Sequence, residues 1–294
     1  SWRRYTNDNF TGIRIMGVFQ NNLLAGAAAA ATAGSGAFYD FQIEQSVRFS
    51  RSESTQMTRT FGSNGNRKKF TISWWAKLTA SAGFSDAQYY FLNTASHTSP
   101  YGGFIYCTNT AAGYGDSVLY FTTNPGDGAS SRYAASNGNY RDTSGFGHIV
   151  LIVDTAQSSE GDRLQIYLNG SRLDVHNGGS LAQDTDSILN GNVIHRLGAR
   201  QDSSSSHFFD GYVAEMHWVD GYAYDASYFG ETKNGVWIPK DYYTTTGNYG
   251  NTGFYLKFEN ASDLGNDSSG NNNDWTVSNM GADHQVLDSP TFGS

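Results

Sequence analysis

An oxygen-rich stretch close to the C-terminal end of the sequence could hold a metal ion. Between positions 267 and 274 every side chain except that of Gly270 is a carboxylate, an amide or a hydroxyl, and calcium prefers such oxygen ligands. Ordinary turns use the same residue types, because Asp and Asn bond to nearby backbone and tolerate positive φ. Both interpretations are open. The candidate calcium ligands are Asp267, Ser269, Asn271, Asn273 and Asp274, and a second, smaller candidate is the pair Asp184 and Asp186.

A carboxylate in the segment VAEMHWVD could act on a sugar. Glycoside hydrolysis usually needs two carboxylates flanking the scissile bond. Glu215 is the best candidate, but the next acid is Asp220, and on a strand this odd spacing puts the two side chains on opposite faces. His217 shares a face with Glu215, yet one acid and one histidine do not make the pair of carboxylates that glycoside hydrolysis needs. The sequence also lacks the serine-elbow, zinc-protease and phosphate-loop motifs. We therefore expect no enzymatic activity, with a polysaccharide hydrolase using Glu215 as the less favoured alternative.

Aromatic side chains near polar loops could bind a sugar without cleaving it. Tyr and Trp combine an apolar ring with a polar group, which suits a platform flanked by amides and carboxylates. A sandwich also needs aromatic residues to cover the edges of its core, so both roles are open. The candidates are Tyr114, Tyr133, Tyr140, Tyr222, Tyr224 and Trp237.

Short strands joined by turns must position these residues. The segments 70–78 and 147–155 are rich in β-branched, aromatic and aliphatic residues, as strands require. Asn169-Gly170 lies between alternating apolar residues and predicts a type I′ hairpin. Further strands are predicted within 208–224 and 253–260, and residues 225–235 could form one or two helical turns. The pattern predicts an all-β fold, an antiparallel β-sandwich.

The composition limits the classes of partner. The chain has 294 residues, 34 of them Gly, with 15% aromatic and only 16% charged residues. Gly and aromatic residues in these amounts suit many strands and tight turns. The formal net charge of −8 predicts no nucleic-acid partner. No apolar run reaches transmembrane length, so no membrane is expected. The single cysteine, Cys107, cannot form an internal disulfide.

The character of the sequence changes near residue 40. The first forty residues contain SWRRYTNDNF, the strand-like GIRIMGVF and the small-residue run LLAGAAAAATAGSGAF. A helix as short as this run allows is marginal in water. We predict an extended N-terminal arm over residues 1–40, which anchors the protein on a neighbour, and a β-sandwich domain over residues 41–294. A flexible tail is the alternative for the arm.

The order of the predicted strands resembles that of a known superfamily. The segments that carry the resemblance are FTISWWAKL, GHIVLIVDTAQ with RLQIYLNGSRLD, IHRLGAR, and FFDGYVAEMHWVDGYAYDASYFGE. They resemble the laminin G / pentraxin / concanavalin A-like jelly rolls, several of which bind calcium. LKFENASDLGNDSSGNNNDWT resembles the opening strand and turn of that family but stands near the end here. The resemblance implies a permuted strand order, in which the 253–260 strand pairs near QSVRFS and brings Phe49 and Phe258 into the same region.

Shorter phrases resemble proteins of tailed, marine-type bacteriophages. They are the arm, EQSVRFS, GNRKKFTISWWAKL and VLDSPTF. This resemblance implies a non-enzymatic virion structural protein, assembled in the host cytoplasm, whose sandwich faces outward. It would decorate the capsid or attach a tail fibre to host surface glycans, contact other virion proteins through residues 1–40, and form a homo-oligomer, with a trimer suiting a fibre. The alternative is a calcium-dependent carbohydrate-binding lectin outside a virion.

Overall fold

The computed structural model describes residues 38–79, 88–94, 101–107, 118–124, 132–138, 140, 142–178, 181–200 and 208–291. The chain divides into two units, Ser1–Asp40 and Phe41–Ser294. The predicted arm falls outside the described residues except for positions 38–40, so its role stays a prediction. Within the described ranges, no helix has the length and apolarity needed to cross a membrane.

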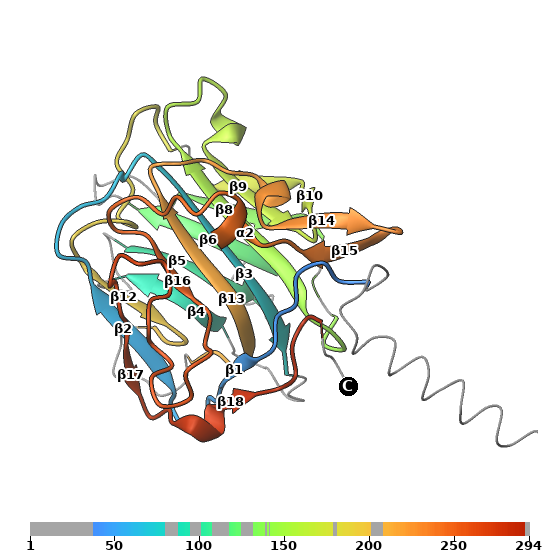
Figure 1. Ribbon diagram of the computed structural model, residues 1–294. Helices are drawn as coiled ribbons and strands as arrows, with labels where there is room; N and C mark the ends of the chain where they lie inside the picture. Colours follow the sequence, from blue (N-terminus) through green and yellow to red (C-terminus); the bar gives the residue numbers. More distant parts are fainter. Residues whose placement is uncertain are drawn as a thin grey trace, which may run out of the picture. The chain divides into compact units, whose positions relative to one another are not determined.

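The first sheet contains the longest strands of the protein (Figure 1). Every strand pair described in it is antiparallel. Its order is β10 (Ser171–Arg172), β9 (Leu164–Leu168), β8 (Gly147–Asp154), β3 (Lys69–Leu78), β13 (Gly211–Asp220), β1 (Ser46–Phe49) and β18 (Gln285–Val286), with β16 (Phe254–Leu256) also paired to β13.

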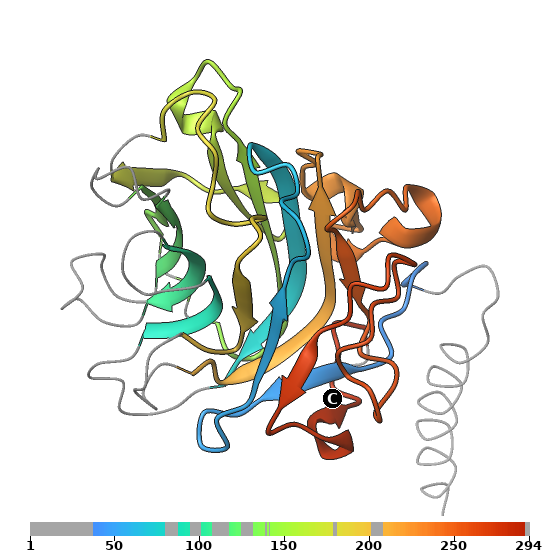
Figure 2. The same ribbon diagram turned by 90° about the vertical axis from the view of Figure 1, so that its left-hand side faces the viewer.

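The second sheet faces the first (Figure 2) and is also antiparallel. Its order is β11 (Val175–Gly178), β7 (Tyr133–Ser136), β6 (Val118–Asn124), β5 (Tyr101–Cys107), β4 (Gln88–Thr94), β12 (Ile194–Leu197), β2 (Gln56–Thr60) and β17 (Thr276–Ser278). A separate hairpin joins β14 (Gly230–Lys233) to β15 (Val236–Pro239), and short helical turns occupy Glu160–Asp162, Ala226–Tyr228, Ala282–His284 and α2 (Tyr242–Thr245).

The core lies between the two sheets. Trp74 of β3 meets Phe91 of β4 and Phe104 of β5, with ring centroids 4.8 and 5.0 Å apart. All three side chains are fully buried, and such aromatic residues contribute much of the apolar area that stabilises a core. Rings from opposite sheets therefore interdigitate, which confirms the predicted antiparallel β-sandwich.

The predicted Asn-Gly hairpin joins β9 to β10. Asn169 has a φ of +48° and Gly170 a φ of +81°, as the two central positions of a type I′ turn require. The backbone N–H of Asn169 donates to the His148 carbonyl (2.9 Å), and the Asn169 side-chain oxygen accepts from the His148 N–H (2.8 Å). The turn is thus fixed to the start of β8.

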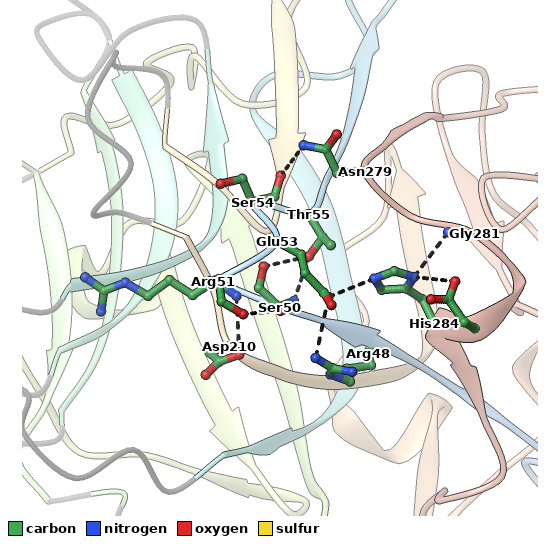
Figure 3. A network of polar contacts seen from close by, with 12 residues as sticks. Arg48, Ser50, Arg51, Glu53, Ser54, Thr55, Asp210, Asn279, Gly281 and His284 are labelled. Carbon is green, nitrogen blue, oxygen red and sulfur yellow. Dashed lines mark hydrogen bonds and ion pairs between the residues drawn. The ribbon is translucent and has the colours of Figure 1, made fainter.

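The late strand and the first strand lie along the same side of β13. β1 pairs with residues 211–213 of β13, and β16 pairs with residues 216–218. The two strands follow one another instead of pairing, and Phe49 and Phe258 join one core cluster as the permuted order implied. Figure 3 shows how the C-terminal segment is also held to the β1–β2 loop: Glu53 Oε2 accepts from His284 Nε2 (3.2 Å), and the Ser54 carbonyl accepts from Asn279 Nδ2 (3.1 Å).

Candidate functional site

Two segments cross between the sheets at one end of the sandwich. Residues 137–146 lead from β7 to β8, and residues 173–174 lead from β10 to β11. The backbone N–H of Asn137 donates to the Asp174 carbonyl (3.0 Å), so the two crossings are tied together. Side chains of both crossings meet the edge of the core there, and they leave hollows around Tyr140.

Two hollows share Tyr140 and Leu168. The first encloses about 470 Å³, and its apolar lining is Leu119, Tyr140, Leu168 and Leu173. The second encloses about 330 Å³ on the β8 side, next to Phe146. Volumes of this size suit a small ligand or one or two sugar rings. Polar groups surround the apolar lining, namely Ser136, Asn137, Gly138 and Asp174 in the first hollow and Asp142, Gly145, Gly147 and Asn169 in the second. We call the two hollows together the Tyr140 groove.

The Tyr140 groove combines a neutral phenol with negative charge. Burial, and then the charge of Asp142, raises the pKa of Tyr140 to about 12. Hydrogen bonds from the hydroxyl (2.6 Å) and the backbone N–H (2.8 Å) of Ser144 lower the pKa of the Asp142 carboxyl. Asp142 and Asp174 are both exposed. The groove therefore presents apolar carbon surface, a protonated tyrosine hydroxyl and two carboxylates to a ligand.

The five predicted calcium ligands lie in one turn. Asp267 is buried, and its Oδ1 accepts from the backbone N–H groups of Tyr255 (2.9 Å) and Ser269 (2.8 Å). Its Oδ2 accepts from the Ser269 hydroxyl (2.9 Å) and the Asn273 N–H (2.8 Å). Asp274 Oδ1 accepts from the Asp267 N–H (2.8 Å). Each Asp267 oxygen thus accepts two protein hydrogen bonds, and a calcium ion would have to replace some of them.

The amides of the turn are also engaged. Asn271 Nδ2 donates to the carbonyls of Gly250 (2.7 Å) and Gly253 (3.0 Å), and Asn273 Nδ2 donates to that of Gly253 (2.8 Å). The smaller candidate is held differently, because Asp186 pairs with Arg67 at 3.4 Å. Over the described ranges, no three His, Cys, Asp or Glu side chains gather as a metal site would require. Calcium binding at residues 267–274 stays a prediction.

The carboxylate of Glu215 lies beneath aromatic side chains. A register shift between Ala214 and His217 marks a β-bulge in β13, and Glu215 has a φ of +52° there. The Tyr255 hydroxyl donates to Glu215 Oε1, and His217 Nε2 is 3.6 Å from the same oxygen. Only 4% of Glu215 is exposed. Glu215 and His217 thus share a face of β13, and the Glu215 carboxylate is buried against Tyr255 and His217.

Asp220 serves the loops, as its separation from Glu215 suggests. Its Oδ1 accepts from the Asn66 N–H and from Asn190 Nδ2, both at 2.6 Å. Its Oδ2 accepts from the N–H groups of Asn251 (3.2 Å) and Thr252 (3.4 Å). These four donors occupy the carboxylate of Asp220, which links the end of β13 to the segments around Asn66, Asn190 and Asn251.

The other predicted sugar-binding aromatics separate into different places. Trp237 donates from Nε1 to His148 Nδ1 (3.0 Å) under the β14–β15 hairpin. Tyr222 stacks on Tyr224 with centroids 5.1 Å apart, and Tyr133 lies 4.8 Å from Tyr120. Tyr114 lies outside the described residues. Of the predicted set, Tyr140 borders the two hollows described above.

The polar residues that line the groove with Tyr140 were not found from the sequence. Asn137, Asp142 and Asp174 were not singled out, although residues 136–147 surround one tyrosine with Asn, Asp, Ser and Gly. That local mixture was the available signal. Leu119 and Leu173 carry no signal, because the fold alone brings them to this end of the sandwich.

No known protein family and no curated protein matches the sequence. Solved structures match the fold. A heptameric SAP-like pentraxin from Limulus polyphemus aligns at 14% identity and a TM-score of 0.43, over 68% of this chain and 94% of the pentraxin. Two domains of the mouse laminin alpha1 chain align at 12% identity and 0.41, over 62% and 44%. Tailspike protein 2 from an Escherichia coli O157:H7 bacteriophage aligns at 12% identity and 0.41, over 63% and 25%. At these identities the likeness is one of fold alone.

Proposed function

We propose that this protein is a non-enzymatic glycan-binding β-sandwich and that the Tyr140 groove is its sugar site. The observation that carries the proposal is the meeting of two hollows at one tyrosine, with leucine side chains inside and amides and carboxylates around them. Sugars offer both apolar C–H faces and hydroxyl groups, so they bind sites that combine aromatic or aliphatic surface with a few oriented polar groups.

Glycan binding without cleavage fits the position of the acids. Glu215 is buried under Tyr255 and away from water, whereas Asp142 and Asp174, the acids of the Tyr140 groove, are both exposed. Exposed carboxylates can accept hydrogen bonds from sugar hydroxyls. A catalytic acid needs a raised pKa, whereas hydrogen bonds from Ser144 lower the pKa of Asp142.

A glycan array tests the proposed site. The wild-type protein should bind a subset of immobilised oligosaccharides, and Tyr140→Ala should lose at least about tenfold in affinity, which corresponds to about 1.4 kcal/mol. Tyr222→Ala is the matched control, because Tyr222 is an exposed tyrosine remote in sequence from the groove. Equal losses in both variants, or no bound glycan at all, would contradict the proposal.

We propose further that the sandwich faces outward on a bacteriophage particle. The support is the sequence resemblance of the arm and of the phrases EQSVRFS, GNRKKFTISWWAKL and VLDSPTF to phage proteins. In this proposal residues 1–40 anchor the protein on capsid or tail proteins, the Tyr140 groove meets host surface glycans, and the copies form a homo-oligomer. A calcium-dependent lectin outside a virion is the alternative.

Purified particles test the virion proposal. Mass spectrometry should detect the chain, and labelled electron microscopy should place it over the shell for decoration or at the tail for host attachment. A variant that lacks residues 1–40 should fold and yet fail to join the particle. Absence of the chain from clean particles would overturn the virion role and leave the glycan site as the whole proposal.

A further inference from the structure

We infer that the Tyr140 groove selects uncharged oligosaccharides and rejects those that carry carboxylate or sulfate groups. This inference rests on the proposed glycan-binding function and adds the chemical class of the ligand. It follows from the charges of the groove, from the partner of the neighbouring arginine, and from the donors and acceptors that face a ligand.

Both charged side chains in the described lining of the groove are carboxylates. Asp142 lies in the lining of the second hollow and Asp174 in that of the first. Both are exposed, and the bonds from Ser144 favour the ionised form of Asp142. Among the described lining residues there is no Lys or Arg. An acidic sugar would therefore place like charges together, which suppresses binding of the wrong partner.

The arginine closest in sequence to Asp174 is engaged elsewhere. Arg172 Nη1 pairs with Asp162 Oδ1 at 2.7 Å, and Arg172 Nη2 donates to the Gly161 carbonyl (2.8 Å). Its charge is thus matched by the carboxylate of Asp162, the last residue of the short helical turn Glu160–Asp162. A guanidinium that is already paired in this way is less available to bind the carboxylate or sulfate of an acidic glycan.

Neutral groups of the groove suit an uncharged sugar. The side-chain oxygen of Asn169 accepts from the His148 N–H (2.8 Å), so the NH₂ group of this amide is the part that can donate to a ligand. Leu168 and Leu173, both half-buried, offer carbon surface to the C–H face of a sugar ring, and the buried Leu119 completes the apolar lining. The carboxylates of Asp142 and Asp174 can accept from sugar hydroxyls.

Matched oligosaccharide pairs test the inference. The full-length protein is titrated by calorimetry with neutral hexose and N-acetylhexosamine oligomers, and with uronate-bearing, sialylated or sulfated counterparts of the same length. At low salt the acidic member should bind at least about tenfold more weakly than its neutral counterpart, since exposed charges interact over about 10–30 Å at low ionic strength. Added salt should narrow the difference.

Charge-neutralising variants identify the cause of the selection. Asp142→Asn combined with Asp174→Asn should narrow the difference in affinity between neutral and acidic ligands, because both substitutions remove a negative charge. They also keep the shape of the side chain, so the change can be assigned to charge. Arg141→Gln is the control for the cation that the sequence places beside Asp142, and it should not narrow the difference. Equal or tighter binding of acidic oligosaccharides would overturn the inference while leaving the proposed function in place. Binding of neither class, by a protein that unfolds cooperatively, would overturn both.

Discussion

The indole Nε1 of Trp237 donates a hydrogen bond to Nδ1 of His148, and the two nitrogens are 3.0 Å apart. An indole can only donate, so Nδ1 of His148 is the acceptor and the imidazole proton lies on Nε2. That nitrogen is 2.8 Å from the hydroxyl of Ser73, which must then accept. The pair fixes the β14–β15 hairpin to the outer face of the first sheet, and it explains why an aromatic residue that looked available to a sugar is a structural anchor.

Replacement of Trp237 by Phe should loosen the hairpin without changing glycan binding. The variant leaves Nδ1 of buried His148 without its donor, and such a loss costs about 1–3 kcal/mol. Urea unfolding measures the change. Val236→Ala is the control on the same strand, because Val236 is 49% exposed and its truncation should change the free energy of unfolding little. Unchanged stability of Trp237→Phe would show that the hydrogen bond does not hold the hairpin.

The protein should lose stability as the pH falls below about 6.5. Burial lowers the pKa of His148 to about 3, with a smaller contribution from His217, and burial also lowers that of His195 to about 3. The unfolded chain binds these protons near pH 6.5, whereas the folded protein stays neutral at both sites until about pH 3. Each histidine therefore favours unfolding by about 1.4 kcal/mol for every pH unit below 6.5.

Unfolding curves between pH 7 and pH 4.5 measure this slope. His195→Phe should make the slope shallower, because it removes one of the two titrating imidazoles. The phenyl ring can keep the stacking on Phe61, where the centroids are 4.3 Å apart, so the variant should still fold. A slope that is the same in the wild type and the variant would mean that His195 is protonated in the folded protein.

Glu215→Gln should alter stability and not sugar chemistry. The substitution keeps one oxygen as an acceptor for the Tyr255 hydroxyl but replaces the other by a buried NH₂ group, and a buried polar group without a partner costs about 1–3 kcal/mol. We expect a loss of that size in the free energy of unfolding. Incubation with polysaccharides should release no sugar from either protein, as chromatography would show. Release that disappears in Glu215→Gln, with Glu231→Gln as an exposed control, would establish a hydrolase.

Calcium binding at residues 267–274 would raise the thermal stability of the protein. A ligand that binds the folded protein at about 100 times its Kd stabilises it by about 2.7 kcal/mol, so calcium should raise the Tm and a chelator should reverse the rise. Asp267→Asn should abolish the calcium effect and also lower the Tm in chelator, because its amide would face the N–H of Asn273 or Ser269. Identical melting curves with calcium and with chelator would leave the hydrogen bonds of Asp267 as the whole account of this turn.

Local patterns were sufficient for the central strands. The apolar run of β8, the branched and aromatic residues of β3 and the Asn-Gly turn of β9–β10 each have their cause within a few residues, and all three were predicted. The bulge in β13 was not. Val213, Met216 and Trp218 all face the core, so the alternation slips at Glu215, a slip that the sequence records only as an irregular spacing.

The Tyr140 groove could be predicted only in part. Tyr140 itself stands among turn residues and was a candidate from the sequence. Leu119 comes from β6 and Leu173 from the crossing between β10 and β11, and they meet Tyr140 because two inter-sheet crossings close the same end of the sandwich. Such long-range proximity depends on the pairing of strands and has no signature in the local sequence.

NMR of the leucine methyl groups, during titration with a neutral oligosaccharide that the protein binds, tests the central claim most directly. The methyl signals of Leu168, which borders both hollows, and of Leu119 and Leu173 in the first should shift together and saturate with the ligand, and Tyr140→Ala should abolish the shifts. Saturating shifts that spare these three leucines and appear elsewhere, for example at Leu256 or Leu264 near the 267–274 turn, would place the sugar outside the Tyr140 groove and contradict the account.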